Sequence, residues 1–252
     1  MRYKKLILIV VWGLLIAGVG SLLFFINRHK KNETCASIKI EIKNSENNHF
    51  IDSAIVMEYI SGNAIIGNLM QNIDAGKIES LLENNPHIKN AEVYKNIDGI
   101  LFIKVWQRKA MLRVINNEGE SYYIDEENIK MPTSENYSSR VLVCNGNISE
   151  KCTNSDTINS NTLKTCAGIA QYVHNSSFWM SAVEQIFVTP DGVILLITKM
   201  GDAKVIFGDA VDIETKFDQL FSFYKQALPK VGWDKYNSID VSFKNQIVAR
   251  KK

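Results

Sequence analysis

The chain has 252 residues, enough for one large domain or two small ones, and 46% hydrophobic and 22% charged residues are typical of a globular protein. The 29 basic and 27 acidic residues give a net charge of +2. This balance argues against a dedicated nucleic-acid-binding protein, because such proteins usually carry a strong basic excess.

The N-terminus predicts a membrane anchor. Residues 6–26, LILIVVWGLLIAGVGSLLFFI, carry no charge, and a helix of this length spans about 30 Å, the hydrocarbon thickness of a bilayer. A cleaved signal peptide is the alternative, but its apolar region is usually shorter and is followed by a small-x-small cleavage site. We therefore predict a single-pass protein with a tail (1–5), a transmembrane helix (6–26) and a connector (27–37). Basic residues flank both ends of the helix, so charge alone does not set its orientation.

Residues 38–107 predict a small α+β domain. Ile38–Ile42 alternates like a strand, a helix is expected from Ser53 to Ser61, and Asp74 is a good N-cap for a second helix that ends before Pro86. Residues 88–107 then predict a hairpin with its turn at Asn96–Gly99.

The hairpin leads into a junction between domains. Its second strand places Leu101, Ile103 and Val105 on one face and Trp106 on the other. We interpret Trp106 as packing against the next domain, with a binding aromatic as the alternative. The basic residues Arg108 and Lys109 follow, and we expect them to fix the angle between the two domains.

Residues 108–250 predict a larger β domain with helices. The expected elements, in chain order, are strands at MLRVI, SYYID and RVLVC, a polar and mobile insertion at 145–161, a helix at 162–177, strands at 183–189, 193–198 and 204–207, a helix at 212–228, and strands at SIDVSF and QIVAR. Four aromatic side chains of the last helix lie at helical spacing, which favours core packing over a ligand groove; they are Phe217, Phe221, Phe223 and Tyr224.

The four cysteines form no metal-binding pattern, because no C-x-x-C occurs. Cys144 and Cys152 could close a short disulfide loop in an oxidising compartment. Alternatively, Cys144 and Cys166 are buried thiols and Cys35 is unpaired as well.

No catalytic motif is recognisable. The sequence has no nucleophile elbow, phosphate-binding loop or metalloprotease motif, and no cofactor is predicted. The adjacent carboxylates Asp125, Glu126 and Glu127 indicate either a solvated turn or a metal or acid–base site, and we favour the turn. The terminal strand QIVAR, followed by Lys251 and Lys252, suits an exposed sheet edge on which another chain can pair.

Several motifs in series resemble the bacterial cell-division family FtsQ/DivIB. ENNPHIKNAEVYKNIDGILFIKV is similar to the end of its POTRA domain, WQRKAMLRV to its domain junction and SYYIDEEN to its Y-x-D-x-x-G turn. KVIFGD, KFDQLFSFYKQAL and YNSIDVSFKNQIVAR resemble the last strands and long helix of its β domain. Four positions depart from the family pattern: Gln107 replaces an acidic residue, Lys109 a proline, Asn128 a glycine and Ser242 an arginine.

The resemblance implies a non-enzymatic scaffold of the division machinery. It implies an N-terminus in the cytoplasm, a POTRA-like domain (38–107) that contacts other division proteins, and a β domain (108–250) outside the inner membrane, at the septum. It also implies that the FtsB–FtsL coiled-coil pair is recruited when FtsB adds a strand to the terminal edge. The partner-binding residues carried over are Ile239, Val241, Phe243, Gln246, Ile247, Val248, Ala249 and Arg250.

Two other classes of function remain open from the sequence. One is a membrane-anchored extracytoplasmic enzyme, such as a transferase or hydrolase, whose site leaves no local signature. The other is a POTRA-bearing chaperone or secretion component, which would normally show repeated POTRA units or a transmembrane barrel.

Overall fold

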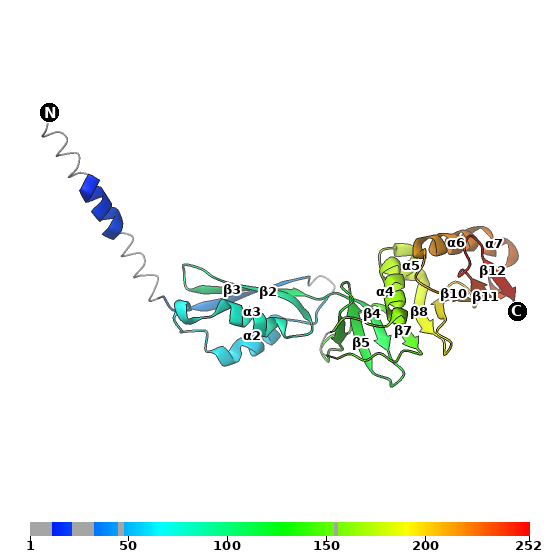
Figure 1. Ribbon diagram of the computed structural model, residues 1–252, viewed down its shortest axis with the longest axis horizontal. Helices are drawn as coiled ribbons and strands as arrows, with labels where there is room; N and C mark the ends of the chain where they lie inside the picture. The colour runs from blue at the N-terminus through cyan, green and yellow to red at the C-terminus, as the bar shows by residue number, and fades with distance from the viewer. Residues whose placement is uncertain (1–11, 22–32, 45–47, 154–155) are drawn as a thin grey trace, which may run out of the picture. The chain divides into compact units, whose positions relative to one another are not determined.

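The computed structural model describes residues 12–21, 33–44, 48–153 and 156–252 (Figure 1). Residues 12–21 are helical, and the two ends of the predicted anchor at 6–26 lie outside the described residues. Within the described ranges, no helix combines the length and apolar character that crossing a bilayer requires.

The chain forms two compact units. The first comprises the described residues up to 44 and Ile51–Gln107, and the second comprises residues 48–50 and Arg108–Lys252. Residues 48–50 therefore belong structurally to the second unit, although the sequence places them before the first helix of the POTRA-like domain. Phe50 explains this, because it is 1% exposed and its ring lies 5.5 Å from that of Tyr123 and 4.9 Å from that of Tyr137.

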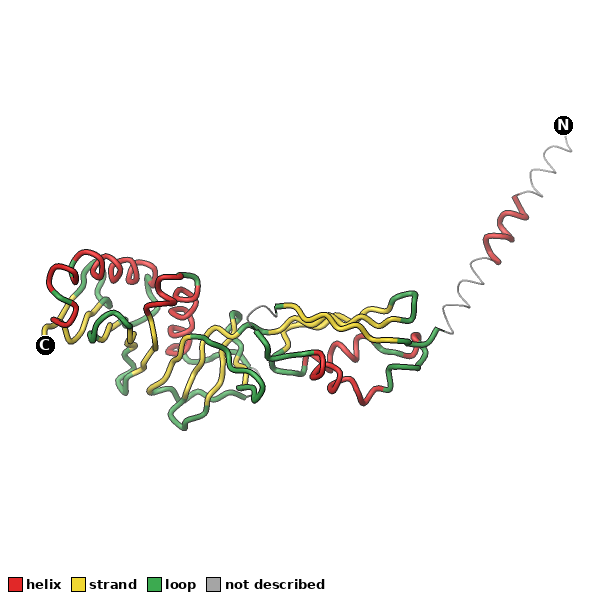
Figure 2. Tube along the Cα trace, turned by 180° about the vertical axis from the view of Figure 1, so that it is seen from behind, coloured by secondary structure: helices red, strands yellow, loops and turns green. Residues whose placement is uncertain are grey.

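The first unit is a three-stranded sheet with helices on one face. Its elements are β1 (Ser37–Lys43), α2 (Ser53–Ile60), the 3-10 turns η1 (Ser61–Asn63) and η2 (Met70–Asn72), α3 (Ala75–Glu83), β2 (Ile88–Lys95) and β3 (Ile100–Gln107). The strand order is β1-β3-β2, with β1 parallel and β2 antiparallel to β3. Figure 2 shows the strands as one layer and the helices as the other.

Local sequence explains these elements. The side chains of Asp52 and Asp74 accept hydrogen bonds from the backbone N–H groups of Ile55 and Lys77, so both helices begin at aspartate caps. In β3, Leu101, Ile103 and Val105 are fully buried, as the predicted hairpin requires.

The second unit is built on a nine-stranded sheet. Its strands are β4 (Ala110–Ile115), β5 (Ser121–Asp125), β6 (Lys130–Pro132), β7 (Leu142–Gly146), β8 (Val183–Val188), β9 (Ile194–Thr198), β10 (Lys204–Ile206), β11 (Tyr236–Asp240) and β12 (Val248–Lys251). The order is β12-β11-β10-β9-β8-β7-β4-β5-β6. Helices α4 (Asn161–His174), α5 (Ser177–Ala182) and α6 (Ile213–Gln226) lie on one side of the sheet, and α7 (Leu228–Val231) follows α6 (Figures 1 and 2).

The core of this unit lies between the sheet and the helices. Phe217 and Tyr224 of α6 are buried, as predicted, and Phe217 stacks on Tyr172 of α4 with ring centroids 4.6 Å apart. Phe221 is 38% exposed and contacts Phe178 at the rim of the core. The mixed α+β class expected from the sequence is confirmed.

Residues 145–161 differ from the expectation of a mobile insertion. Ile148 and Ile158 are 3% and 2% exposed, so both ends of this segment are anchored in the core. Between them, the Glu150 carboxylate accepts hydrogen bonds from the N–H groups of Asn159 and Ser160 at 2.8 and 2.9 Å. Residues 154–155 of the predicted insertion lie outside the described residues, and the described remainder is held by long-range contacts that leave no periodic pattern in the sequence.

Cys35, Cys144 and Cys166 are buried and have free thiols, so the disulfide alternative between Cys144 and Cys152 is not formed. A hydrogen bond from Cys166, together with burial, raises the pKa of the Cys144 thiol well above its ordinary value.

Candidate partner-binding edge

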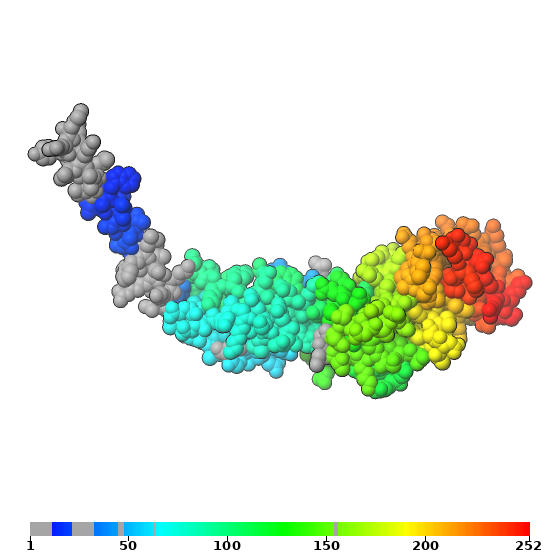
Figure 3. All heavy atoms as spheres, in the orientation of Figure 1, coloured from blue at the N-terminus to red at the C-terminus, as the bar shows by residue number. Residues whose placement is uncertain are grey.

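Strand β12 ends the nine-stranded sheet. It pairs antiparallel with β11, with Asp240 opposite Val248 and Ile239 opposite Ala249. No other described strand lies beside β12, so its outer side carries a row of backbone N–H and C=O groups without a neighbouring ladder. The strand lies at the molecular surface, at the red end of the chain in Figure 3.

Residues 241–247 connect β11 to β12. The Asp240 carboxylate accepts hydrogen bonds from the N–H and the hydroxyl of Ser242, at 3.0 and 2.6 Å. Asn245 then takes a left-handed conformation with φ of 60°, which asparagine tolerates better than most residues. Ser242 therefore contributes to this turn, at the position where the resemblance places an arginine.

The predicted partner-binding residues divide into two groups. Ile239 and Val241 are fully buried in the core, so a partner cannot reach their side chains. Phe243 and Val248 are 47% and 37% exposed. The remaining predicted residues are exposed, as are Gln246 and Arg250, or half-buried, as are Ile247 and Ala249. Gln246 and Ile247 precede the strand.

A groove of about 490 Å³ lies next to this edge, between α6 and residues 245–247. Its lining from the helix and its end comprises Thr215, Asp218, Gln219, Ser222, Phe223, Gln226 and Ala227. The Oε1 atom of Gln219 is buried and has no hydrogen-bond partner. Sequence reasoning missed this groove; the only signal was the polar face of α6 opposite its apolar stripe.

The predicted junction residues have local partners. Arg108 lies in the second unit, where its Nη1 is 2.8 Å from the Asp125 carboxylate, and Lys109 lies 3.3 Å from Glu126. Asp125 is 2% exposed and also accepts hydrogen bonds from the N–H groups of two residues in the following turn. The three adjacent carboxylates thus lie at a turn, as favoured, but the turn is solvated only at Glu126 and Glu127, because Asp125 is buried and paired with Arg108.

Trp106 lies in the first unit, on the face of the sheet opposite the core. It is half-buried, and its cross-strand neighbours are Lys43 and Asn90. Gln107, at the position where the resemblance expects an acidic residue, is 1% exposed and its Oε1 accepts a hydrogen bond from the Ile51 N–H at 2.9 Å.

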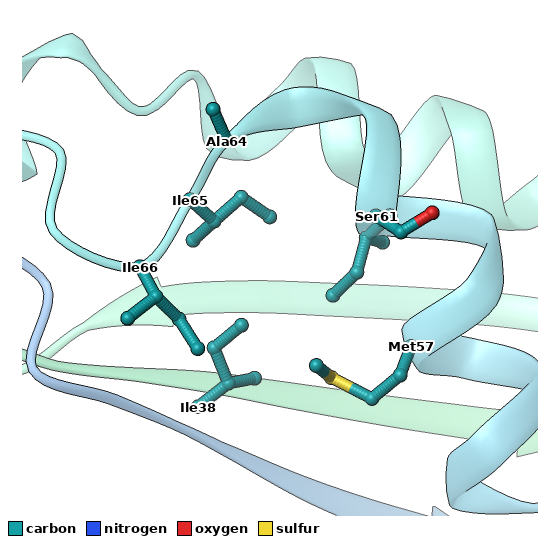
Figure 4. Close-up of a pocket in the computed structure, with 7 residues that line it drawn as sticks. Ile38, Met57, Ser61, Ala64, Ile65 and Ile66 are labelled. Carbon is teal, nitrogen blue, oxygen red and sulfur yellow. The ribbon is translucent and has the colours of Figure 1, made fainter.

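The first unit has a smaller groove of about 220 Å³ between α2 and β1. Its lining is almost entirely apolar, and Figure 4 shows the side chains of Ile38, Met57, Ile65 and Ile66 converging on it. Within the described ranges, no group of three or more histidine, cysteine, aspartate or glutamate side chains is arranged to hold a metal ion.

Comparisons with known proteins agree with this arrangement. The sequence model of the family described as FtsQ/DivIB, C-terminal related, matches residues 109–250. The model of the POTRA-like domain matches residues 33–106. No curated protein matches the chain.

Proposed function

The chain belongs to the FtsQ/DivIB family, and on that premise we propose that it is a non-enzymatic, membrane-anchored scaffold of the bacterial division machinery. Residues 6–26 anchor it in the inner membrane as a single-pass protein, with residues 1–5 in the cytoplasm. Its two units act outside the membrane at the division septum.

The partners are FtsB- and FtsL-like proteins, bound as a coiled-coil pair through the edge of β12. The observation that carries this proposal is the open side of β12, because an extended segment gains main-chain hydrogen bonds there without rearranging the sheet. The exposed side chains Phe243, Val248 and Arg250 supply contacts beside the ladder. The POTRA-like unit contributes contacts with other division proteins.

The groove beside β12, which has both polar and apolar lining residues, supports the same proposal. An added strand that continues past residues 245–247 reaches the side chains of α6, including the unpartnered Gln219 oxygen. The partner surface therefore combines a backbone ladder, which gives affinity, with a side-chain groove, which gives specificity.

Replacing Val248 with proline tests the proposal. Proline removes a backbone donor and bends an edge strand, so binding of the purified FtsB–FtsL pair to the full chain should weaken at least about tenfold. Val248→Thr is the matched control, since threonine keeps the β-branched shape and the N–H and should bind normally. The affinities are measured by calorimetry in detergent, with circular dichroism to verify folding. Equal affinities for the proline variant and the parent would rule out strand addition at β12.

A further inference from the structure

The first unit has one end at which the described chain resumes at Glu33, here called the proximal end. It is formed by residues 33–38, 64–70 and 96–100, which are joined by short backbone hydrogen bonds. The Cys35 N–H donates to Asn68, the Met70 N–H to Glu33 and the Ala36 N–H to Gly99, each at 2.8 Å. Gly99 has a φ of 71°, and a β-carbon there would lie 2.7 Å from the Thr34 carbonyl oxygen. The β2–β3 turn is thus packed closely against the start of the unit.

Two large aliphatic side chains are exposed at this end. Ile97, at the tip of the β2–β3 turn, is 72% exposed, and Ile66 is 61% exposed. Ile66 also lines the apolar groove between α2 and β1, where Met57 is 37% exposed (Figure 4). Single exposed aliphatic residues are common on protein surfaces, but these gather at one end of one unit, and such patches mark interaction sites.

The length of the chain before this end identifies the partner. Only residues 27–32 separate the predicted anchor from Glu33, and six residues span at most about 22 Å when fully extended. The headgroup layer on each side of a bilayer is about 5–8 Å thick. The proximal end is therefore held within a short reach of the membrane surface, and this confinement raises the effective concentration of its apolar side chains there.

We propose that the proximal end of the first unit docks on the bilayer, with Ile66 and Ile97 inserted at the boundary between headgroups and acyl chains. The proposal rests on the membrane anchor of the proposed function. Insertion of apolar side chains is the driving force, because the exposed charges beside the β2–β3 turn, Lys95 and Asp98, are of opposite sign. Docking fixes this unit upright on the membrane rather than leaving it free to rotate about its connector.

The test uses the full chain reconstituted in phosphatidylcholine vesicles whose acyl chains carry a nitroxide quencher. An environment-sensitive fluorophore is attached to Ile66→Cys or Ile97→Cys, in a Cys152→Ser background, where Cys35, Cys144 and Cys166 are buried. Leu14→Cys reports on the anchor. Asn84→Cys is the matched control, because Asn84 is exposed and follows α3 as its C-cap. It lies before the start of β2, at the opposite end of the same unit.

We expect a blue shift and loss of fluorescence at positions 14, 66 and 97, and neither at position 84. Adding Ile66→Asp should restore the fluorescence of the label at 97, and adding anionic phosphatidylglycerol should change little. Quenching at 14 alone would overturn the docking while keeping the anchor, and would leave the two isoleucines to a protein partner. No quenching at 14 would remove the anchor, and the docking with it. Quenching at 84 as strong as at 66 and 97 would also contradict the end-on arrangement.

Discussion

The two outer strands of the nine-stranded sheet, β6 and β12, differ in whether another part of the chain covers their free edge. At β6 the edge is short and covered. This strand has three residues including Pro132, and the chain around Thr157 lies alongside it, with the Lys130 N–H donating to the Asp156 carbonyl at 2.9 Å. The Ile158 N–H donates to the Asn128 carbonyl in the same way. These two hydrogen bonds pair part of this edge with a segment of the same unit.

At β12 the edge is uncovered in the part of the chain that the structure describes. Apart from β11, the groove and the connecting turn lie near this strand. Its basic residues Arg250 and Lys251, and Lys252 directly after it, are exposed. Charge beside an open edge discourages unspecific aggregation while it leaves room for a specific strand. One edge is therefore covered within the unit and the other is open, as the proposed strand addition at β12 requires.

A buried lysine secures the closed edge. Lys130 is 2% exposed, and its Nζ lies 3.2 Å from Glu150, 3.0 Å from Asp156 and 2.9 Å from the Lys151 carbonyl. Removing the lysine leaves the Glu150 carboxylate, whose side chain is 13% exposed, without its cation, whereas Asp156 is 43% exposed and can be solvated. Lys130→Met should therefore reduce the free energy of unfolding of the second unit by about 3–5 kcal/mol. Urea denaturation of the full chain measures this change.

The open edge offers the matched control. Lys252 forms an ion pair with Asp202 at 3.0 Å, but both side chains are largely exposed. Lys252→Met should cost less than about 1 kcal/mol, because solvent screens such pairs. If the two lysine variants lost the same free energy of unfolding, the buried Lys130 would stabilise the protein no more than the exposed Lys252.

Acid should weaken the closed edge through Glu150. Burial acts to raise the pKa of this carboxyl, but the N–H groups of Ser160 and Asn159 and the Lys130 ammonium outweigh it, so its pKa lies below the ordinary 4.5. A lowered pKa contributes stability that is fully present above the ordinary value and is lost as the pH falls through the lowered one. Glu150→Gln should thus be less stable than the parent at pH 7, with a difference that narrows towards pH 3. A constant difference across this range would contradict the assignment.

At high pH the closed edge should lose stability through Lys130, whose pKa is shifted upwards, whereas that of Glu150 is shifted downwards. Burial acts to lower the pKa of Lys130, but hydrogen bonds to Asp156 and Glu150 raise it above the ordinary 10.5. Its contribution is therefore intact below that value and is lost only as the pH rises through the raised pKa. Between these limits neither Glu150 nor Lys130 makes the stability of the closed edge depend on pH.

The sequence predicted those features whose contacts are periodic. Leu101, Ile103 and Val105 alternate, and Phe217 and Tyr224 recur at helical spacing, so their burial follows from local pattern. Helix α5 was missed because six residues are too few for a period to appear. The cover over β6 was missed because Glu150 and Lys130 lie twenty residues apart, with strand β7 between them, and their contact leaves no local pattern.

The candidate site was predictable only in part for the same reason. The terminal strand was recognised, but alternation alone placed Ile239, Val241 and Phe243 on one face without indicating that the first two belong to the core. Strand β11 ends at Asp240, so Phe243 continues beyond it into solvent. The polar face of α6 joined the site only through tertiary structure.

The groove beside the open edge gives a prediction that separates binding from stability. Gln219→Met removes a buried oxygen that has no hydrogen-bond partner, so the unfolding free energy should stay equal or increase. If the partner donates a hydrogen bond to this oxygen, its affinity should fall about tenfold, or about 1.4 kcal/mol. Ser222→Ala is the control, because it changes the surface of the same groove without removing a buried polar atom that lacks a hydrogen-bond partner. Unchanged affinity of the Gln219 variant would place the partner outside the groove.

The smallest effect concerns the turn that leads into the closed edge. Asn128 has a φ of 64°, at the position where the resemblance expects glycine, and its carbonyl receives the Ile158 N–H. Asparagine tolerates the left-handed conformation, glycine adopts it without steric cost, and alanine pays about 1 kcal/mol for it. Asn128→Gly should therefore leave the urea midpoint nearly unchanged, whereas Asn128→Ala should lower the unfolding free energy by about 1 kcal/mol. An alanine variant as stable as the parent would contradict this explanation, because the positive φ would then not account for asparagine at a position where the resemblance expects glycine.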